Sequence, residues 1–577
     1  MILIFGGTTE GRMAVEVCEV AGKPFYYSTK GDSQEVPLHH GIRLTGILTA
    51  ADICQFAAAH GVRCIVDAAH PFAQELHANI HATCLPVIRL ERSYCRHYPE
   101  ATYCKDYIDA LNLLNESPAE CLLALSGVNT IPRLRDYWLR HRTLFRILHR
   151  PESIRMAQKN QFPLQNLIFY TDEKVLPTVE QERELMQQVG CDAILTKESG
   201  ESGGFEAKVE AALQLGLRVF VVQRPPLPAD WIYVTGPHGL RRSIEQLVPD
   251  FFSLRTGLTT GACATAAVKA ALLSLLYDEQ PDEVHFSLPD GEIMVVPVEV
   301  NCRGMATVVK DFSDDPDVTR GCRISAKVEW GHDGIRFLRG KGVGRVTLPG
   351  LGIPVGEPAI NPTPRQMIIQ EVRDLTASDV DITLSVEDGE QLARKTFNPR
   401  VGVLDGISII GTSGIVSPLS NEAFIQSIER ELQVARAIGC SQIGFASGRR
   451  GEEALHAAEP ELRVIHYGNF IGASLQMAYE QGFQRAVVGI MIGKAVKLAE
   501  GNLDTHSHKV TMNKDFLRQV AGPNDSAKIE GITLARELWD IMPPSFFQRI
   551  QELCYQHCRT MFPSGELEIR LICDNPV

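Results

Sequence analysis

The chain has 577 residues, of which 44% are hydrophobic and 22% are charged, a composition typical of globular proteins and a length that accommodates roughly four domains of about 150 residues. Its formal net charge of -13 disfavours a nucleic-acid-binding protein, which normally carries a basic excess. No apolar run approaches the roughly 20 residues of a membrane-spanning helix, and the cysteines include no CxxC pair. We therefore expect a cytoplasmic protein with reduced thiols and no protein-bound metal.

The first 250 residues alternate short apolar strands with amphipathic helical segments. The strands include MILIFGG at the N-terminus and, further along, RCIVDAAH, CLLALSG and RVFVVQRP. Continuous apolar strands separated by helices are typical of parallel sheets that are covered on both faces. We predict an α/β module over residues 1–250, with two Rossmann-like parallel-sheet lobes at about 1–115 and 116–250.

The pattern changes near residue 251. Strands that carry many charges, such as EIMVVPVEV and RISAKVEWG, follow one another between glycine turns, which is typical of an α+β domain. After the sequence NPR, strands and helices alternate again, beginning with VGVLDGISIIGTSG. We predict an α+β domain over residues 251–397 and a Rossmann-like α/β domain over residues 398–577.

A glycine turn joins the first strand to the first helix in ILIFGGTTEGR. Backbone N–H groups at such a turn, together with the partial positive charge of the helix N-terminus, attract a pyrophosphate. Thr8 stands where a GxGxxG motif has its second glycine, so a merely tight turn remains the alternative. Lys30 follows the second strand, where a cation favours NADPH without excluding NADH. The predicted cofactor-binding residues are Gly6, Gly7, Thr8, Thr9, Glu10 and Lys30.

Two later strand ends in this module carry further candidates. His70 in VDAAHPFA could donate a proton to a substrate, or it could serve only as a structural hydrogen-bonding group. Lys197, Ser199 and Gly200 in LTKESGESGG could cradle a carboxylate; a solvated strand end is the alternative. We take His70 and Lys197 as catalytic candidates and Ser199 and Gly200 as substrate-binding candidates.

Three motifs in order connect this module with a known family. GGTTEG, the run DAAHPFA from Asp67 to Ala73, and the TKESG loop that ends in VVQRP resemble the precorrin-6A reductase family of cobalamin biosynthesis. The resemblance covers about residues 1–245. It implies a two-domain, Rossmann-like reductase that uses NADPH or NADH to reduce one double bond of a tetrapyrrole.

The stretch LRTGLTTGACATAAVKAALL, Leu254 to Leu273, reads like a second beginning. A Gly/Thr loop runs directly into a helix of small residues. Its polar groups could hold a carboxylate at the helix N-terminus, while a threonine N-cap is the structural alternative. The substrate-binding candidates in this loop are Arg255, Thr256, Thr259 and Thr260.

The last third of the chain offers a second turn and several cations. The turn Gly411, Thr412, Ser413, Gly414 follows an apolar run and is, from its residues alone, an anion-binding turn. Asn398 and Arg400 precede it, while Lys494 and His506 lie near later strand ends. We take Asn398, Arg400 and Lys494 as substrate-binding candidates and His506 as a catalytic one.

These segments resemble the cobalt-precorrin-5B C1-methyltransferase family. RTGLTTGACATAA, KTFNPRVGVLDGISIIGTSGIVSPLS and GKAVKLAEGNLDTHS match its signatures in order, from Leu254 essentially to the C-terminus. The resemblance implies S-adenosylmethionine as methyl donor, which makes the Gly411–Gly414 turn the candidate cofactor loop. It also implies cobalt only as part of the substrate.

Together the two resemblances predict a bifunctional enzyme. It would methylate C1 of cobalt-precorrin-5B and then reduce the C18–C19 double bond of cobalt-precorrin-6A. Its partners would be a carboxylate-rich tetrapyrrole, other copies of itself, and transiently other cobalamin-pathway enzymes, with no nucleic acid or membrane. The alternative from another class is a nucleotide-binding sensor or scaffold without turnover.

Overall fold

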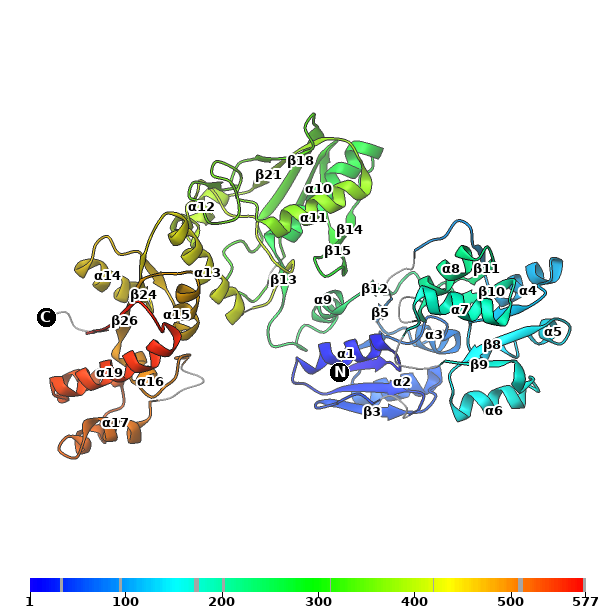
Figure 1. Ribbon diagram of the computed structural model, residues 1–577, viewed down its shortest axis with the longest axis horizontal. Helices are drawn as coiled ribbons and strands as arrows, with labels where there is room; N and C mark the ends of the chain where they lie inside the picture. Colours follow the sequence, from blue (N-terminus) through cyan, green and yellow to red (C-terminus); the bar gives the residue numbers. More distant parts are fainter. Residues whose placement is uncertain are drawn as a thin grey trace. The chain divides into compact units, whose positions relative to one another are not determined.

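The computed structural model describes residues 1–31, 35–92, 96–170, 176–199, 203–311, 313–418, 420–506 and 512–573 (Figure 1). The chain folds into two compact units. The first comprises Met1–Ser253 with Glu292–Met294, and the second comprises Leu254–Gly291 with Val295–Val577.

The first unit contains two six-stranded parallel sheets, and the first of these has the strand order β12-β5-β4-β1-β2-β3. Every residue of β1 is buried, because Ile2 and Ile4 face α1 and α9 while Leu3 and Phe5 face α2 and α3. We call this sheet and its helices the first lobe. Its elements are β1 (Ile2–Phe5), α1 (Thr9–Glu19), β2 (Phe25–Thr29), β3 (Gly41–Thr45), α2 (Ala50–His60), β4 (Cys64–Asp67), α3 (Gln74–His81), β5 (Val87–Leu90), β12 (Ile232–Val234) and α9 (Pro237–Leu247).

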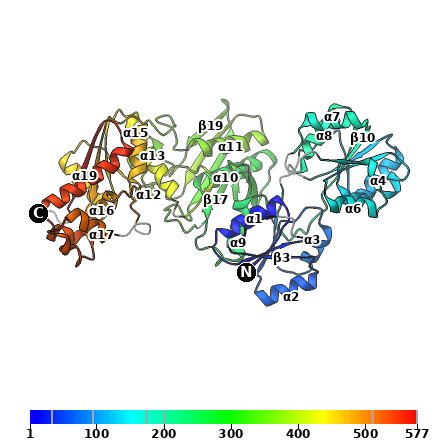
Figure 2. The same ribbon diagram turned by 60° about the horizontal axis from the view of Figure 1, so that its bottom comes forward.

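The second sheet has the order β6-β11-β10-β7-β8-β9, again all parallel. Figure 2 shows α7 and α8 on one face and α4 and α6 on the other, as the two apolar clusters of this lobe require. The elements of this second lobe are β6 (Thr102–Cys104), α4 (Tyr107–Glu116), β7 (Leu122–Ala124), α5 (Arg135–Trp138), β8 (Thr143–Ile147), α6 (Pro151–Lys159), β9 (Leu167–Phe169), α7 (Val179–Val189), β10 (Ala193–Lys197), α8 (Phe205–Gln214) and β11 (Arg218–Val222).

The two parallel sheets agree with the predicted α/β module, but the strands are divided between them differently from the predicted lobes of about 1–115 and 116–250. The strand β6 precedes residue 116 and yet belongs to the second sheet, and the helix α4 that follows it packs in the core of the same lobe. After β11 the chain returns, and β12 pairs in parallel with β5, Ile232 opposite Ile88. Helix α9 then packs beside α1 through Leu240 and Ile244. Alternating strands and helices predict parallel pairing, but they do not say which sheet a strand joins.

The second unit begins with an α+β domain. Its main sheet has the order β16-β17-β18-β21-β19, antiparallel except for β19 beside β21. Three two-stranded pairings accompany it: β13 with β23, β14 with β15, and β20 with β22. The strands are β13 (Gly257–Leu258), β14 (Glu283–Ser287), β15 (Ile293–Pro297), β16 (Glu299–Cys302), β17 (Met305–Val309), β18 (Arg323–Trp330), β19 (Ile335–Arg339), β20 (Arg345–Val346), β21 (Val380–Val386), β22 (Val403–Leu404) and β23 (Ile415–Val416), and the helices are α10 (Thr260–Tyr277), α11 (Pro362–Leu375) and α12 (Gly389–Ala393).

Helix α10 is the central helix of this domain. Its small and apolar residues are buried along most of its length. By length and composition it is the one helix among the described residues that could span a membrane, but 72% of its apolar window is buried inside the protein. That degree of burial is typical of a core helix.

A four-stranded parallel sheet, β25-β24-β26-β27, forms the rest of the second unit. Residues of α13, α15, α16 and α19 share one large apolar cluster, while α14 covers a smaller one. The elements are α13 (Asn421–Ala437), β24 (Gln442–Ala446), α14 (Arg449–Ala458), β25 (Val464–His466), α15 (Ile471–Glu480), β26 (Arg485–Met491), α16 (Ile492–Ala499), α17 (Lys514–Ala521), α18 (Leu538–Ile541), α19 (Pro544–Met561) and β27 (Glu566–Ile572).

The start of this C-terminal domain differs from the prediction. The segment that follows residue 398 does not enter the parallel sheet. Instead β22 pairs with β20, and β23 pairs with β13, so residues 403–416 lie with the α+β domain. The parallel sheet begins only at β24, because the short apolar strands before it pair with strands of the α+β domain.

Candidate functional site

The predicted phosphate turn lies at the switch point of the first sheet. After β1 the chain moves outward through β2 and β3, and β4 returns to the other side of β1. Loops at the carboxyl ends of two such strands enclose the ligand crevice of an open α/β sheet. Here these loops are joined directly, since the Thr8 hydroxyl donates to the Ala68 carbonyl oxygen at 2.7 Å. Thr8 also caps α1, accepting from the Gly11 N–H at 3.1 Å.

The two glycines of this turn have different reasons to be glycine. A Cβ on Gly6 would lie 2.3 Å from the ring of Tyr27, so Gly6 makes room for that buried side chain. Gly7 has φ +97° and nothing within 4 Å of a Cβ position, and its N–H donates to the Tyr27 hydroxyl at 3.1 Å. The open side of Gly7 therefore fits the close approach of a phosphate group.

The other predicted cofactor residues surround this turn. Thr9 and Glu10 begin α1, and Lys30 follows β2 at an exposed position. Arg43 on β3 was missed; its guanidinium lies 5.7 Å from the centre of the Tyr27 ring. The signal in the sequence was a cation inside the strand GIRLT, one strand beyond the ribose-reading position.

The switch point of the second sheet lies between β7 and β10. Lys197 ends β10, and Ser199 after it is buried. After β7 comes a turn that sequence analysis did not single out, in which the hydroxyls of Ser126 and Thr130 lie 2.8 Å apart. Gly200 lies outside the described residues.

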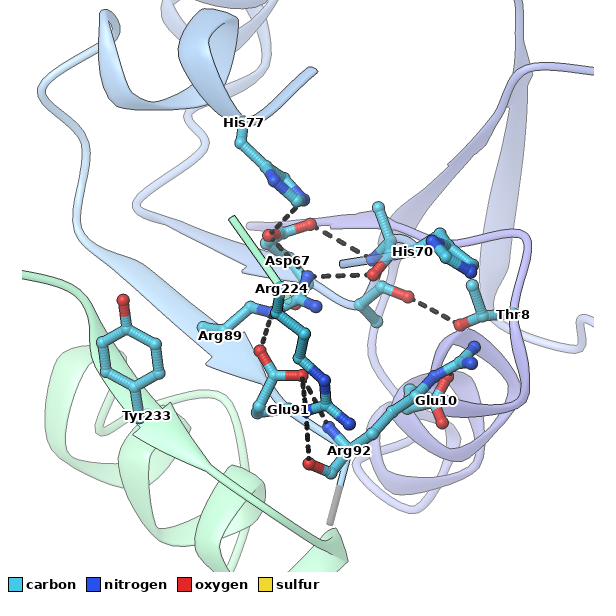
Figure 3. Close-up of polar contacts among 12 residues, drawn as sticks. Thr8, Glu10, Asp67, His70, His77, Arg89, Glu91, Arg92, Arg224 and Tyr233 are labelled. Atoms are coloured by element: carbon cyan, nitrogen blue, oxygen red, sulfur yellow. Dashed lines mark hydrogen bonds and ion pairs between the residues drawn. The ribbon is translucent and has the colours of Figure 1, made fainter. Parts of the chain in front are cut away.

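Arg92 connects the phosphate turn of the first lobe with the Lys197 loop of the second. Its guanidinium lies 2.9 Å from a Glu10 carboxylate oxygen and donates to the Ser199 carbonyl oxygen at 2.9 Å. In addition, the Lys197 ammonium lies 5.3 Å from the centre of the Phe72 ring, two residues after His70. The structure thus brings Glu10, His70, Lys197 and Ser199 into one region, and Figure 3 shows the part around His70 and Arg92.

His70 is neutral in this region. The Phe72 N–H donates to its Nδ1 at 3.2 Å, which leaves the proton of the neutral ring on Nε2. Burial, with the cations Lys197, Arg92, Arg89 and Arg224 nearby, lowers the pKa of His70 to about 3. The neutral ring can donate a hydrogen bond through Nε2, but it carries no ionisable proton at pH 7.

Lys197 lies in a positively charged environment. Burial, followed by the cations Lys208, Arg92 and Arg133, lowers the pKa of its ammonium group to about 8. A lysine with such a pKa is mostly protonated at pH 7 and loses its proton more readily than an ordinary lysine. Among the described residues, no carboxylate forms an ion pair with it.

A buried network of charges holds the two loops in place (Figure 3). Arg89, with a fully buried side chain, donates to Asp67 at 2.8 Å, to the Ala69 carbonyl oxygen at 2.9 Å and to Glu91 at 3.1 Å. Glu91 in turn accepts from Arg224 at 3.0 Å. Arg224 continues to the second lobe by donating to the Glu198 carbonyl oxygen at 3.1 Å. One chain of contacts therefore reaches from the His70 loop to the Lys197 loop.

The sequence contains a signal for this network in one of the buried strands. Arg89 stands inside the apolar strand VIRL, where all four residues are buried. A buried guanidinium must be paired with carboxylates. An arginine inside a fully apolar strand therefore predicts that acidic side chains lie next to it.

In the second unit, the opening loop that begins at Leu254 and the Gly411–Gly414 turn lie side by side. The strand β13 in the opening loop pairs with β23, with Gly257 opposite Val416 and Leu258 opposite Ile415. The Thr259 N–H donates to the Gly414 carbonyl oxygen at 2.9 Å. A Cβ on Gly411 would lie 2.3 Å from the Thr259 hydroxyl. The Gly411–Gly414 turn thus packs on the N-terminus of α10, and its middle residues Thr412 and Ser413 are exposed.

The threonines of the opening loop are engaged in this junction. Thr259 caps α10 by accepting from the Ala262 N–H at 3.1 Å. The Thr260 hydroxyl accepts from the Ile410 N–H at 2.9 Å. Arg255 pairs with Asp314 at 3.2 Å, and Thr256 is buried. The hydroxyls of Thr259 and Thr260 therefore position the turn.

Lys494 and His506 lie elsewhere, at the carboxyl edge of the parallel sheet. Lys494 donates to the Gly468 carbonyl oxygen beyond β25, and burial, followed by the nearby Lys497, lowers its pKa to about 8. Lys497 donates to the Thr505 carbonyl oxygen at 3.4 Å, next to His506. This edge thus presents two lysines at the switch point between β24 and β26.

Asn398 and Arg400 do not join that edge. The Asn398 amide donates to the Gly406 carbonyl oxygen at 3.2 Å. Arg400 pairs with Glu431 at 3.1 Å and with Glu452 at 3.0 Å. Asn398 thus binds the loop after β22, and Arg400 binds the helices α13 and α14.

Each half of the chain matches a known protein family. The model of the family described as precorrin-6x reductase CbiJ/CobK matches residues 1–245, and the CbiD family model matches residues 249–418. A cobalt-precorrin-5B C(1)-methyltransferase from Prosthecochloris aestuarii is 44% identical over 345 residues, covering 55% of this chain and 94% of the relative.

Two solved structures resemble the same halves. The cobalamin biosynthesis protein cbiD from Archaeoglobus fulgidus is 30% identical, with 44% of this chain and 83% of that chain covered and a TM-score of 0.26. A CobK precorrin-6A reductase is 26% identical, with 43% and 97% covered and a TM-score of 0.35. The chain therefore belongs to the cobalt-precorrin-5B C(1)-methyltransferase family and is a fusion, in which a module of the precorrin-6x reductase family precedes the methyltransferase.

Proposed function

We propose that the chain carries out two consecutive steps of cobalamin biosynthesis in the cytoplasm. The second unit methylates C1 of cobalt-precorrin-5B with S-adenosylmethionine. The first unit reduces the C18–C19 double bond of the resulting cobalt-precorrin-6A with NADPH or NADH. The observation that carries the reductase part is the bridge made by Arg92, which holds the phosphate turn beside the Lys197 loop.

In the reductase unit, the open side of Gly7 and the first turn of α1 would hold the pyrophosphate of the dinucleotide. Lys30, with Arg43 one strand further, supports NADPH, whose 2′-phosphate needs a cation. The nicotinamide supplies the hydride, and the protein supplies alignment and charge. The tetrapyrrole would lie between the two switch points, with a carboxylate near Lys197 and Ser199.

The proton that completes the reduction must come from a group that carries one. Lys197 is mostly protonated at pH 7, whereas the free enzyme holds His70 neutral. We therefore propose Lys197 as the proton donor. His70 then orients the substrate through its Nε2–H.

In the methyltransferase unit, the exposed residues Thr412 and Ser413 support the Gly411–Gly414 turn as the contact to S-adenosylmethionine. Lys494, with Lys497 beside it, supports binding of carboxylates of the macrocycle, and His506 on the same edge is the catalytic candidate. Methyl transfer from a sulfonium proceeds in line, so the protein contributes mainly proximity and orientation.

One incubation tests the proposal. The purified chain is mixed with cobalt-precorrin-5B, S-adenosylmethionine and NADPH or NADH, and the product mass is recorded. A gain of one methyl group and two hydrogens supports both steps. Unchanged mass under conditions where both nucleotides bind would support the alternative, a nucleotide-binding sensor or scaffold.

A further inference from the structure

In the described part of the chain, the region around His70 and Lys197 has positive charge that no carboxylate neutralises. The carboxylates there are engaged with arginines: Glu10 with Arg92, Asp67 and Glu91 with Arg89, and Glu91 also with Arg224. Glu198 accepts from the Arg224 backbone N–H at 3.2 Å. Lys197 remains without an ion-paired partner in the described part of the chain. Lys208, Arg92 and Arg133, all cations, lie near enough to lower its pKa, and the Phe72 ring lies 5.3 Å from its ammonium nitrogen.

Cations also lie near the imidazole of His70, and Arg92 is common to both groups. Lys197 contributes from the end of β10, Arg92 and Arg89 from β5 and the residues after it, and Arg224 from the end of β11. The Phe72 N–H fixes Nδ1 at 3.2 Å. Only Nε2 of this ring is therefore left to interact with a ligand.

We propose that His70 and Lys197 form one carboxylate-binding subsite, and that a carboxylate bound there is accompanied by a proton taken from solvent onto one of these two side chains. The identity of the ligand as a carboxylate-rich tetrapyrrole rests on the proposed function. In this step one N–H bond forms, the proton is supplied by a buffer acid or hydronium ion in the solvent, and no other covalent bond changes. A neutral imidazole or amine becomes an imidazolium or ammonium that pairs with the incoming anion.

The physical reason is the effect of an opposite charge on both groups. A carboxylate within about 4–6 Å favours the protonated form of a nearby base and so raises its pKa. The pKa of Lys197 would rise from about 8 toward its ordinary value, giving proton uptake between about pH 8 and 10. The pKa of His70 would rise from about 3, giving uptake at mildly acidic pH. By linkage, affinity for the anion must then fall as the pH rises through each window.

Calorimetry of the full chain tests this with uroporphyrin, a tetrapyrrole that bears carboxylates on every ring. Binding heats are compared in pairs of buffers with different ionisation enthalpies, at pH 5.5 and at pH 8.5. The wild-type protein should take up a measurable fraction of a proton at both pH values. All proteins compared at pH 8.5 also carry Lys494→Arg, so that the lysine of the second unit, whose pKa is likewise about 8, adds no uptake. In that background Lys197→Arg, which keeps a permanent charge, should bind without uptake at this site. The exposed Lys159→Arg should behave like the parent protein.

His70→Asn provides the second arm, because an asparagine oxygen can still accept from the Phe72 N–H but cannot titrate. It should lose the uptake at pH 5.5 and keep that at pH 8.5. Failure of uroporphyrin to bind, or equal uptake by the wild type and both variants, would overturn the subsite. Uptake as expected, without reduction of cobalt-precorrin-6A, would instead overturn the proposed function alone.

Discussion

Arg89 is the residue whose removal should cost the first unit most. Its side chain is fully buried between Asp67 and Glu91. Arg89→Met leaves the buried Asp67 without its paired arginine and leaves Glu91 with Arg224 alone. We expect the free energy of unfolding to fall by about 3–5 kcal/mol, measured by urea denaturation. Arg155→Met breaks a pair whose side chains are 71% and 75% exposed, so it should cost less than about 1 kcal/mol. Equal losses would contradict the network's role.

At the residue scale, we expect Lys494 to make the rate of methyl transfer depend on pH. Its pKa of about 8 in the free protein means that the ammonium form, which would hold a substrate carboxylate, is lost as the pH rises above that value. We expect kcat/KM for methyl transfer to fall above about pH 8. Lys494→Arg should keep its activity to higher pH because a guanidinium stays charged. If the two profiles coincide, Lys494 does not bind the substrate through its charge.

At the scale of elements, the junction between β13 and β23 depends on Thr260. Thr260→Val removes the acceptor for the Ile410 N–H from a part-buried hydrogen bond between the buried Thr260 and the exposed Ile410, and a lost hydrogen bond of this kind costs about 0.5–1.5 kcal/mol. We expect the second unit to lose that much stability in urea denaturation. Thr412→Val on the exposed turn is the matched control and should leave stability nearly unchanged. A similar loss in both variants would show that the turn, and not the Thr260 hydroxyl, is the sensitive feature.

The sequence predicted the strands of the first unit better than it predicted how they pair. Continuous apolar runs such as MILIFGG correctly predicted buried parallel strands, because only a strand covered on both faces needs an apolar residue at every position. They could not predict that β12 returns to the first sheet, or that residues 403–416 leave the last domain. Those pairings are contacts between distant segments, and a local pattern carries no information about the partner.

In the candidate site, too, single residues could be predicted from the sequence, but their spatial arrangement could not. His70 and Lys197 could be found separately, since each follows an apolar strand. Their proximity could not be predicted, because it depends on two switch points and on Arg92, whose position after a strand looks like that of any exposed arginine. Arg89 is different: its place inside a buried strand was a readable signal.

At the scale of the whole molecule, the two compact units predict that the two activities can be lost separately. Gly7→Asp places a carboxylate on the open side of the phosphate turn, where like charge repels a pyrophosphate by several kcal/mol. Reduction should therefore fall about tenfold or more while methyl transfer persists. Lys494→Met removes a charged hydrogen bond to a carboxylate, worth about 1.5–3 kcal/mol, so it should raise the KM of methylation by roughly ten- to hundredfold and leave reduction intact. Both variants are tested in the full chain, with each step followed by product mass from its own substrate. If either change abolishes both steps in a folded protein, the two units do not divide the work, and one site serves both reactions.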